Sequence, residues 1–442
     1  MATYDLIIKN GTVVTAEKTV QADIAVKDGK IIKVSPDKAI AESADRVIDA
    51  EGLHVFPGLI DSHVHFNEPG RTEWEGIETG SKSLAAGGAT AYFDMPLNST
   101  PPVINKENLQ IKQDLAKEKS VVNAYCWGGL VPENIADLKA MHEGGVIGFK
   151  AFMSPSGIAD FDNADDETLY KGMKEIASFG SLLAVHAEST VICEELAEEK
   201  KAAGKTSAQD YVDSRPIISE IEAVRRIISY AEATGCKLHV VHASSRKVVA
   251  LIEEAKQRGV DVTVETCPHY LSLTVEDLAE QKAIAKCAPP LRDKHEVEDL
   301  WAAVKNGEID TIGSDHSPAP ADMKVITDNF FEGWGGISGA QSTLNILLTE
   351  GHFKRGVPLE KIVEVAATNP ARIFGIPLKG SIDAGYDADI TLVNLSESFV
   401  LEQEDLYYRH KHSPYIGREY QGKVQTTIVN GEVVYEDGKI VK

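Results

Sequence analysis

The run Ser181-Leu-Leu-Ala-Val-His186 is a short apolar stretch that ends in a histidine and leads into the small-residue segment 187–189. Runs of this kind are typical of strands buried on both faces, and they recur along the middle of the chain. Helical patterns separate most of them, for example over 220–233 and 246–258. We expect strands at 55–60, 90–93, 121–126, 146–150, 182–186, 238–242, 260–265 and 310–313.

This alternation favours an α/β fold, a (β/α)8 barrel of the TIM type over residues 56–375. An open doubly wound sheet fits the same alternation and stays open as an alternative. The two ends of the chain follow another pattern, because Asp28-Gly29 and Asn430-Gly431 are hairpin signals between apolar runs. We therefore expect a second, smaller β-sandwich domain built from residues 1–55 and 376–442 together.

Composition excludes several classes of protein. Of the 442 residues 43% are hydrophobic and 26% charged, which is ordinary for a globular protein, and the net charge of −23 leaves no basic footprint for nucleic acid or anionic membranes. With neither a signal-peptide pattern nor a membrane-spanning apolar stretch, we expect a cytoplasmic protein. The five cysteines are scattered, without a CxxC pair, which argues against a disulfide framework or a thiolate zinc site.

Two histidines stand at the end of the first expected barrel strand, in Asp61-Ser-His63-Val-His65. Side chains two residues apart on a strand point to the same side, so His63 and His65 can converge on one metal ion. Two unrelated surface histidines would give the same pattern, and the motif alone leaves both interpretations open.

Three more polar residues follow apolar strands in the same way: His186, His242 and Asp315. In a barrel these positions lie at the C-terminal rim, where active sites are built. His239 is three residues before His242 and is expected to pack instead. His54, His269, His316, His410, His412 and the histidines at 142, 295 and 352 are also expected to be structural.

Lys150 lies in the apolar strand Val146-Ile-Gly-Phe-Lys150, with no carboxylate near it in the sequence. One interpretation is a lysine at the strand end whose aliphatic stem is buried while its ammonium group reaches solvent. If the four histidines and Asp315 hold two divalent ions, however, a protonated lysine there would be strongly repelled. Carbamylation by CO2 turns the amine into an anion with two oxygens, which can bridge both ions. Aspartate, carbamate and a bridging hydroxide would then leave a single positive charge on the centre, suited to polarising a carbonyl.

With these residues in place, the chain resembles the cyclic amidohydrolases of the amidohydrolase superfamily. The resemblance implies a distorted barrel, a β-sandwich-like domain from both ends, and two metals bound by His63, His65, carbamylated Lys150 (N6-carboxylysine), His186, His242 and Asp315. Zinc suits this ligand set, and cobalt, manganese or iron fit it too. The resemblance also implies a homo-oligomer, a tetramer or a dimer. The similar segments are NGTVVTA (10–16), FPGLIDSHVHF (56–66), DMPLNSTPP (94–102), GFKAFM (148–153), VHAE (185–188), HVVHASS (239–245), ETCPHYL (265–271), KCAPPLR (286–292), GSDHSP (313–318), TNPARIFG (368–375) and ITLVNL (390–395).

Departures from the motifs of individual subfamilies point to a substrate class. Dihydroorotases have an arginine where this chain has Asn67, and hydantoinases and dihydropyrimidinases have a tyrosine where it has Pro155, in the run Phe152-Met-Ser-Pro155. The segments 65–71, 94–100 and 286–292 are similar to those of allantoinases. The resemblance therefore implies hydrolysis of the hydantoin ring of allantoin to allantoate, with a hydantoinase, a dihydropyrimidinase or a dihydroorotase-like enzyme as the alternative.

In that reaction Asp315 is expected to take a proton from the attacking hydroxide and pass it to the departing ring nitrogen, which leaves poorly as an anion. Asn98, Cys287, Ser317 and the main chain near Gly336 are expected substrate contacts. A non-catalytic interaction protein on the same fold is the alternative from a different class, and such relatives typically lose metal ligands. The glycines of 333–339 follow no strand-to-helix turn, so a dinucleotide loop is excluded.

Overall fold

The computed structural model describes residues 3–36, 40–41, 43–326 and 329–442. In the larger body, parallel strands follow one another around a barrel, in the order β6-β7-β8 and then β9 to β14. β9 follows β8 after a single residue, Trp127. The indole Nε1 of Trp127 donates to the carbonyl oxygen of Ser62 in β6 at 3.2 Å. The strands are β6 (Leu59–Val64), β7 (Ala89–Asp94), β8 (Asn123–Cys126), β9 (Gly128–Gly129), β10 (Phe149–Phe152), β11 (Leu182–His186), β12 (Lys237–Val240), β13 (Val262–Thr266) and β14 (Thr311–Ile312).

The ring of strands closes between its last and first members. A parallel bridge joins Val64, at the end of β6, to His316, which follows β14. The amide of His65 also donates to the carbonyl of His316 at 2.8 Å. The expectation of a TIM-type barrel is therefore confirmed, and the open sheet is excluded.

The expected first barrel strand, 55–60, is wrong in its bounds. The structure divides it at Gly58 between β5 (His54–Pro57), which belongs to the terminal sheet, and β6. A Cβ on Gly58 would lie 2.1 Å from Thr90 Cγ2, so only glycine allows the chain to pass so close to β7 as it changes sheets. The sequence does not reveal this change of sheet, because the residues on both sides of Gly58 are buried and form one continuous apolar run.

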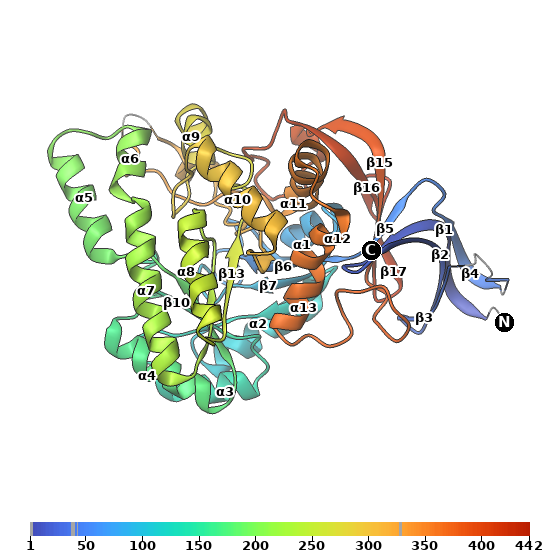
Figure 1. Ribbon diagram of the computed structural model, residues 1–442, viewed down its shortest axis with the longest axis horizontal. Helices are drawn as coiled ribbons and strands as arrows, with labels where there is room; N and C mark the ends of the chain where they lie inside the picture. The colour runs from blue at the N-terminus through green and yellow to red at the C-terminus, as the bar shows by residue number, and fades with distance from the viewer. Residues whose placement is uncertain (1–2, 37–39, 42, 327–328) are drawn as a thin grey trace.

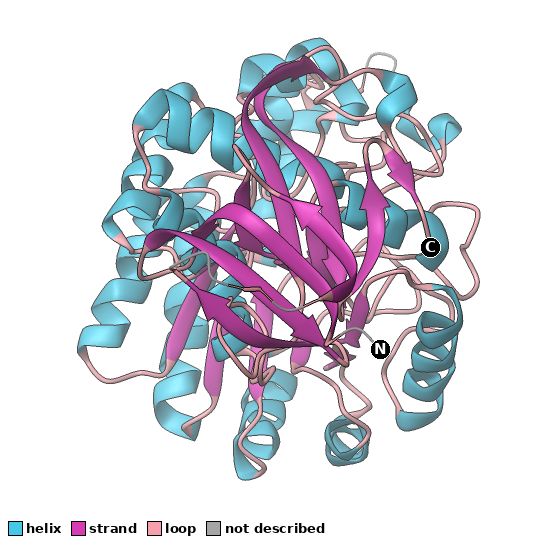
Figure 2. Cartoon of the chain, turned by 90° about the vertical axis from the view of Figure 1, so that its right-hand side faces the viewer, coloured by secondary structure: helices cyan, strands magenta, loops and turns pink. Residues whose placement is uncertain are grey.

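The two ends of the chain form one nine-stranded sheet, which lies at one end of the molecule in Figure 1 and faces the viewer in Figure 2. β5 joins its halves, because it pairs with β1 on one side and with β15 on the other. Both ends thus build the smaller domain, as expected; its division from the barrel at residues 55 and 376 stays a prediction. The remaining strands are β1 (Tyr4–Val14), β2 (Thr19–Lys27), β3 (Lys30–Ser35), β4 (Ala44–Asp49), β15 (Ile390–Val400), β16 (Glu419–Val429), β17 (Glu432–Glu436) and β18 (Lys439–Ile440).

Helices surround the barrel (Figure 1). In α7 the buried residues Ala223, Val224, Ile227, Ile228 and Ala231 recur at the helical spacing and form one apolar stripe. Within the described ranges no helix is long and apolar enough to cross a membrane. The helices are α1 (Ile77–Ala86), α2 (Lys106–Lys119), α3 (Leu138–Glu143), α4 (Asp166–Ser178), α5 (Thr190–Ala202), α6 (Ala208–Ser214), α7 (Ile217–Thr234), α8 (Arg246–Gln257), α9 (Val275–Gln281), α10 (Lys294–Asn306), α11 (Thr343–Ile346), α12 (Leu359–Val363) and α13 (Asn369–Ile373).

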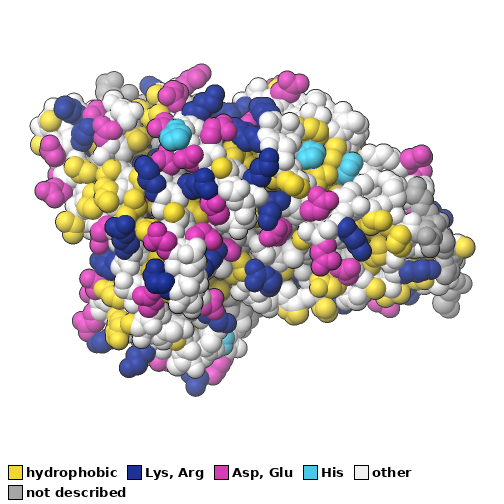
Figure 3. All heavy atoms as spheres, viewed as in Figure 1, with side chains coloured by type: hydrophobic (Ala, Val, Ile, Leu, Met, Phe, Trp, Pro, Cys, Tyr) yellow, Lys and Arg dark blue, Asp and Glu magenta, His cyan; other side chains and the backbone are white. Residues whose placement is uncertain are grey.

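The surface carries charges of both signs. On the face shown in Figure 3 acidic and basic side chains are interspersed, and no broad basic patch gathers there.

A buried ion pair fixes the segment that carries His65. Lys112 Nζ of α2 lies 2.9 Å from Asp94 Oδ2 at the end of β7, and both side chains are 1% exposed. Lys112 also donates to the carbonyl of Phe66 at 2.9 Å, and the amide of Phe66 donates to Asp94 at 3.0 Å. The pair thus holds both backbone polar groups of Phe66, the residue that follows His65.

Lys112→Met should lower the free energy of unfolding by about 3–5 kcal/mol, because it leaves the Asp94 carboxylate buried without its partner. Lys117→Met, on the exposed face of the same helix, should change it by less than about 0.5 kcal/mol. Urea unfolding of both variants measures the difference, and equal midpoints would contradict the role given to the pair.

Candidate metal centre

A cavity of about 640 Å³ lies at the C-terminal rim of the barrel strands. Five of the predicted metal ligands line it, and they come from four different strand ends: His63, His65, His186, His242 and Asp315. Barrel closure thus gathers side chains that are up to 252 positions apart in the sequence, between 63 and 315. The rim is where (β/α)8 barrels build their sites.

His63 and His65 converge on Asp315, as their spacing predicts. Each Nε2 lies 3.2 Å from the same oxygen, Asp315 Oδ1. Ligand atoms about 2.1 Å from one ion are roughly 3.0–3.5 Å apart, so this group has the dimensions of a cation site. All three ligand atoms lie within 4.8 Å of one another.

His186 and His242 form the second half of the cluster. His186 Nδ1 lies 3.1 Å from His242 Nε2, and the His242 ring lies 5.5 Å from that of His63. The ring of Phe152 stacks on His186 at 4.8 Å and covers one of its faces. The two pairs of imidazoles therefore belong to one site.

Carboxylates behind two of the imidazoles decide which ring nitrogen faces the cavity. Glu265 Oε1 lies 2.9 Å from His63 Nδ1, and Glu188 Oε2 lies 2.7 Å from His186 Nε2. An ionised carboxylate only accepts, so these nitrogens carry the protons, and His63 Nε2 and His186 Nδ1 offer bare lone pairs to the site.

The charges support this arrangement. Burial lowers the pKa of His63, His186 and His242, so their imidazoles are neutral at pH 7. Burial raises the pKa of Glu188, but Arg215 and His186 outweigh it and hold that pKa well below its usual range. The site thus presents neutral imidazoles backed by ionised carboxylates.

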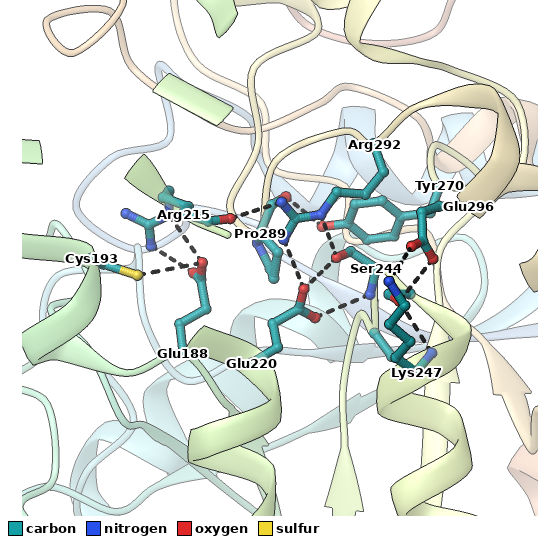
Figure 4. A network of polar contacts seen from close by, with 12 residues as sticks. Glu188, Cys193, Arg215, Glu220, Ser244, Lys247, Tyr270, Pro289, Arg292 and Glu296 are labelled. Carbon is teal, nitrogen blue, oxygen red and sulfur yellow. Dashed lines mark hydrogen bonds and ion pairs between the residues drawn. The ribbon is translucent and has the colours of Figure 1, made fainter. Parts of the chain in front are cut away.

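Arg215 anchors Glu188 from the cavity wall (Figure 4). Its Nε and Nη2 donate to the two Glu188 oxygens at 3.1 and 2.6 Å. Its own carbonyl accepts from Arg292 Nη1 at 2.7 Å, and Arg292 is paired in turn with Glu220 at 2.9 Å. A continuous polar network therefore holds the carboxylate that orients His186.

Lys150 lies beneath the cavity on β10 and is completely buried. Its Nζ has no hydrogen-bond partner, and its nearest aromatic contact is the Phe152 ring, 5.1 Å away. Burial lowers the pKa of Lys150 to about 8, so roughly a tenth of the amine is neutral at pH 7. A buried ammonium without a hydrogen-bond partner is costly, so Lys150 is an unusual residue that calls for a functional explanation.

These donors fit divalent cations. His63 Nε2, whose lone pair faces the site, and His65 Nε2 both approach the same carboxylate oxygen, so a cation placed among the three atoms could bind all of them. Two of the ligand-bearing residues also have unusual backbones, because φ is +42° at His242 and +47° at Asp315. Such strain is typical of residues held in place for function.

The four predicted substrate contacts, Asn98, Cys287, Ser317 and Gly336, all line the cavity. Asn98 adopts a φ of +73°, and its carbonyl accepts from Arg71 at 2.9 Å. Gly336 has a φ of +115°, and a Cβ there would lie 2.4 Å from the carbonyl oxygen of Ser317. Their roles as contacts stay predictions. Asn67, whose identity bears on the substrate class, is fully buried, and its side-chain amide has no hydrogen-bond partner.

Sequence reasoning missed the residues behind the cluster. Glu188 and Glu265 stand inside the quoted motifs, and a carboxylate within the apolar strand β13 is as unusual as Lys150. His239, expected to pack, also reaches Glu265, with its Nε2 3.7 Å from Oε2. His269, expected to be structural, lies near Asp315 together with Cys267.

Known proteins resemble this chain along its length. An allantoinase of Deinococcus radiodurans is 50% identical over 435 residues, which are 98% of this chain and 96% of that protein. An allantoinase of Solibacter usitatus is 50% identical over 436 residues, 99% of this chain and 94% of the relative.

Solved structures resemble it equally widely. The L-hydantoinase (dihydropyrimidinase) of Arthrobacter aurescens superimposes with a TM-score of 0.96 at 35% identity, over 100% of this chain and 98% of the other. The sequence pattern of the amidohydrolase family matches residues 54–434, which include every member of the cluster and the strands β5, β15 and β16 of the terminal sheet. The chain therefore belongs to the amidohydrolase family.

Proposed function

We propose that this protein is an allantoinase, which hydrolyses the hydantoin ring of allantoin to allantoate. The observation that carries the proposed chemistry is the meeting of four imidazoles and Asp315 at the rim cavity, with the unpartnered buried amine of Lys150 on the adjoining strand β10. The substrate is supported by the near-complete match to proteins named allantoinase. Asn67 and Pro155 stand where dihydroorotases and hydantoinases carry other residues, which supports the same choice.

The proposed ligands of two divalent metals are His63, His65, Lys150, His186, His242 and Asp315, with zinc suited to them and cobalt, manganese or iron as alternatives. When bound, the metals would polarise the scissile carbonyl and make water nucleophilic at neutral pH. The neutral Lys150 amine would add to CO2, forming an N–C bond and releasing one proton, to give a carbamate with two oxygens that could serve as metal ligands.

Asp315 is placed to move the proton. Burial raises the pKa of this carboxyl, but His63 and His65 outweigh it and hold that pKa well below its usual range, so it is ionised and can accept. It takes a proton from the attacking water and delivers it to the ring nitrogen that leaves. Asn98, Cys287, Ser317 and Gly336 are the proposed contacts for the ring and the ureido group.

A hydantoinase or dihydropyrimidinase is the second candidate, favoured by the TM-score of 0.96 with an enzyme of that name. Rates of ring opening for allantoin, hydantoin, dihydrouracil and dihydroorotate, compared on one preparation, separate the candidates. We expect the highest kcat/KM for allantoin, and a higher value for any other ring would move the protein to that subfamily. We further propose that it works in the cytoplasm as a homo-oligomer, a tetramer or a dimer.

Lys150→Ala should abolish activity and metal retention, because it removes the group proposed to bridge the metals. Short carboxylic acids should restore part of the activity by supplying carboxylate oxygens in the space left by the side chain. Elemental analysis and rates measure both effects, with Lys237→Ala, an exposed lysine on β12, as the control. A variant that keeps two metals and full activity would refute the carbamate.

Glu188→Gln should weaken divalent metal binding about 10–100-fold, as expected for loss of a carboxylate that orients a ligating histidine. The amide can present its NH2 to His186 Nε2 and stabilise the wrong tautomer, which removes the lone pair from Nδ1. Competition with a chromophoric chelator measures the affinity. Glu194→Gln, exposed on α5, is the matched control, and equal affinities for the two variants would show that Glu188 does not orient His186.

A further inference from the structure

A second group of ligand atoms meets at Asp315. Cys267, His269 and Asp315 each contribute one atom, and the three atoms lie within 4.8 Å of one another. The same criterion is met by His63, His65 and Asp315. Asp315 therefore belongs to two groups of three ligands, of which only one is used by the proposed hydrolytic centre.

The two groups flank Asp315 from neighbouring strands. In the barrel, the segment after β14 lies between β13 and β6, since β14 pairs with β13 and His316 bridges to Val64. β6 ends in His63-Val-His65, and β13 is followed by Cys267-Pro-His269. Each of the two strand ends thus carries two ligand-type residues that are separated by one residue. The two strand ends lie on opposite sides of the shared carboxylate of Asp315.

Apart from the shared Asp315, the side chains of this second group have no hydrogen bond or disulfide that commits them elsewhere. His269 is 1% exposed, and neither of its ring nitrogens has a hydrogen-bond partner. Cys267 is completely buried and forms no disulfide. A buried imidazole usually satisfies its polar nitrogens, so an unpartnered one beside a thiol and a carboxylate points to a missing ligand.

The ligand types define the class of that ligand. Thiolate, imidazole and carboxylate together suit borderline and soft divalent ions such as Zn²⁺, Co²⁺ and Cd²⁺, and they disfavour Mg²⁺ and Ca²⁺, which prefer oxygen. Three protein ligands also leave a position open for water. An ion can enter from the rim cavity, which Asp315 lines with a side chain that is 14% exposed.

We propose that Cys267, His269 and Asp315 form an additional site for a thiophilic divalent cation, next to the hydrolytic centre and sharing its aspartate. Binding replaces the thiol proton of Cys267 with the metal and releases that proton to solvent. An ion bound there engages the carboxylate that the reaction needs for proton transfer. Metal added beyond the two ions of the proposed hydrolytic centre therefore inhibits the enzyme. The inhibition rests on the proposed function, whereas the site itself does not.

The test titrates Cd²⁺ into the enzyme already loaded with its full complement of Zn²⁺. Thiolate bound to Cd²⁺ gives an ultraviolet charge-transfer band, which imidazole and carboxylate ligands do not give. We expect the band to rise as Cd²⁺ is added, to be absent in Cys267→Ser, and to require about tenfold or more Cd²⁺ in His269→Asn, since a lost ligand should cost at least as much as a lost outer partner. Ring-opening rates on the same samples should fall in parallel.

Two other buried thiols serve as controls. Cys236→Ser, before β12 at the opposite end of the barrel, and Cys287→Ser, in the cavity wall, should both keep the band. A band that persists in Cys267→Ser or disappears in Cys287→Ser would overturn the proposal, as would release of Zn²⁺ without any band. Because the band needs no substrate, it tests the site even if allantoin proves not to be the substrate.

Discussion

The approach of two imidazoles to one carboxylate oxygen is the constraint on which the rest of the site depends. His63 Nε2 and His65 Nε2 both lie 3.2 Å from Asp315 Oδ1. The lone pair of His63 Nε2 repels the carboxylate oxygen that it faces, and a positive charge between them turns the repulsion into binding. Barrel closure brings the three together, because the bridge between Val64 and His316 fixes the last strand against the first. The contact between the first and last barrel strands therefore both closes the fold and assembles the proposed ligand group.

The residues around this contact hold its side chains in fixed orientations. Glu265 and Glu188 hold the outer nitrogens of His63 and His186, and Arg215 holds Glu188 through two hydrogen bonds. Orientation by such outer partners sets both the tautomer and the direction of a lone pair. Lys150 lies beneath without a partner, and it is the one cation there that the proposed carbamate would convert into a ligand. The neutral imidazoles, the ionised aspartate and the buried amine are thus parts of a single electrostatic arrangement.

The comparisons agree with this arrangement, but they bear on two separate questions, the class of reaction and the choice of substrate. They are the membership of the amidohydrolase family and the likeness to allantoinases and to a hydantoinase. The barrel is shared with the matched solved structure, and the cluster at its rim indicates the reaction class. Substrate choice depends on loops, where Asn67 and Pro155 differ from the residues of other subfamilies. Sites grafted on a common barrel vary by such loops while the ligand-bearing strand ends stay in place.

The sequence by itself determined the alternation of strands and helices, the β-rich ends, and the polar residues at the ends of four of the strands, because burial on both faces produces continuous apolar runs whose ends are visible. It placed the ligand candidates at one rim, since the carboxyl ends of parallel strands share an edge. Only the tertiary structure decided that 55–60 is split between two sheets at Gly58, that Glu188 meets Arg215, and that Cys267 and His269 reach Asp315. These facts join segments far apart in the chain through barrel closure and loop packing, which leave no periodic trace in the sequence.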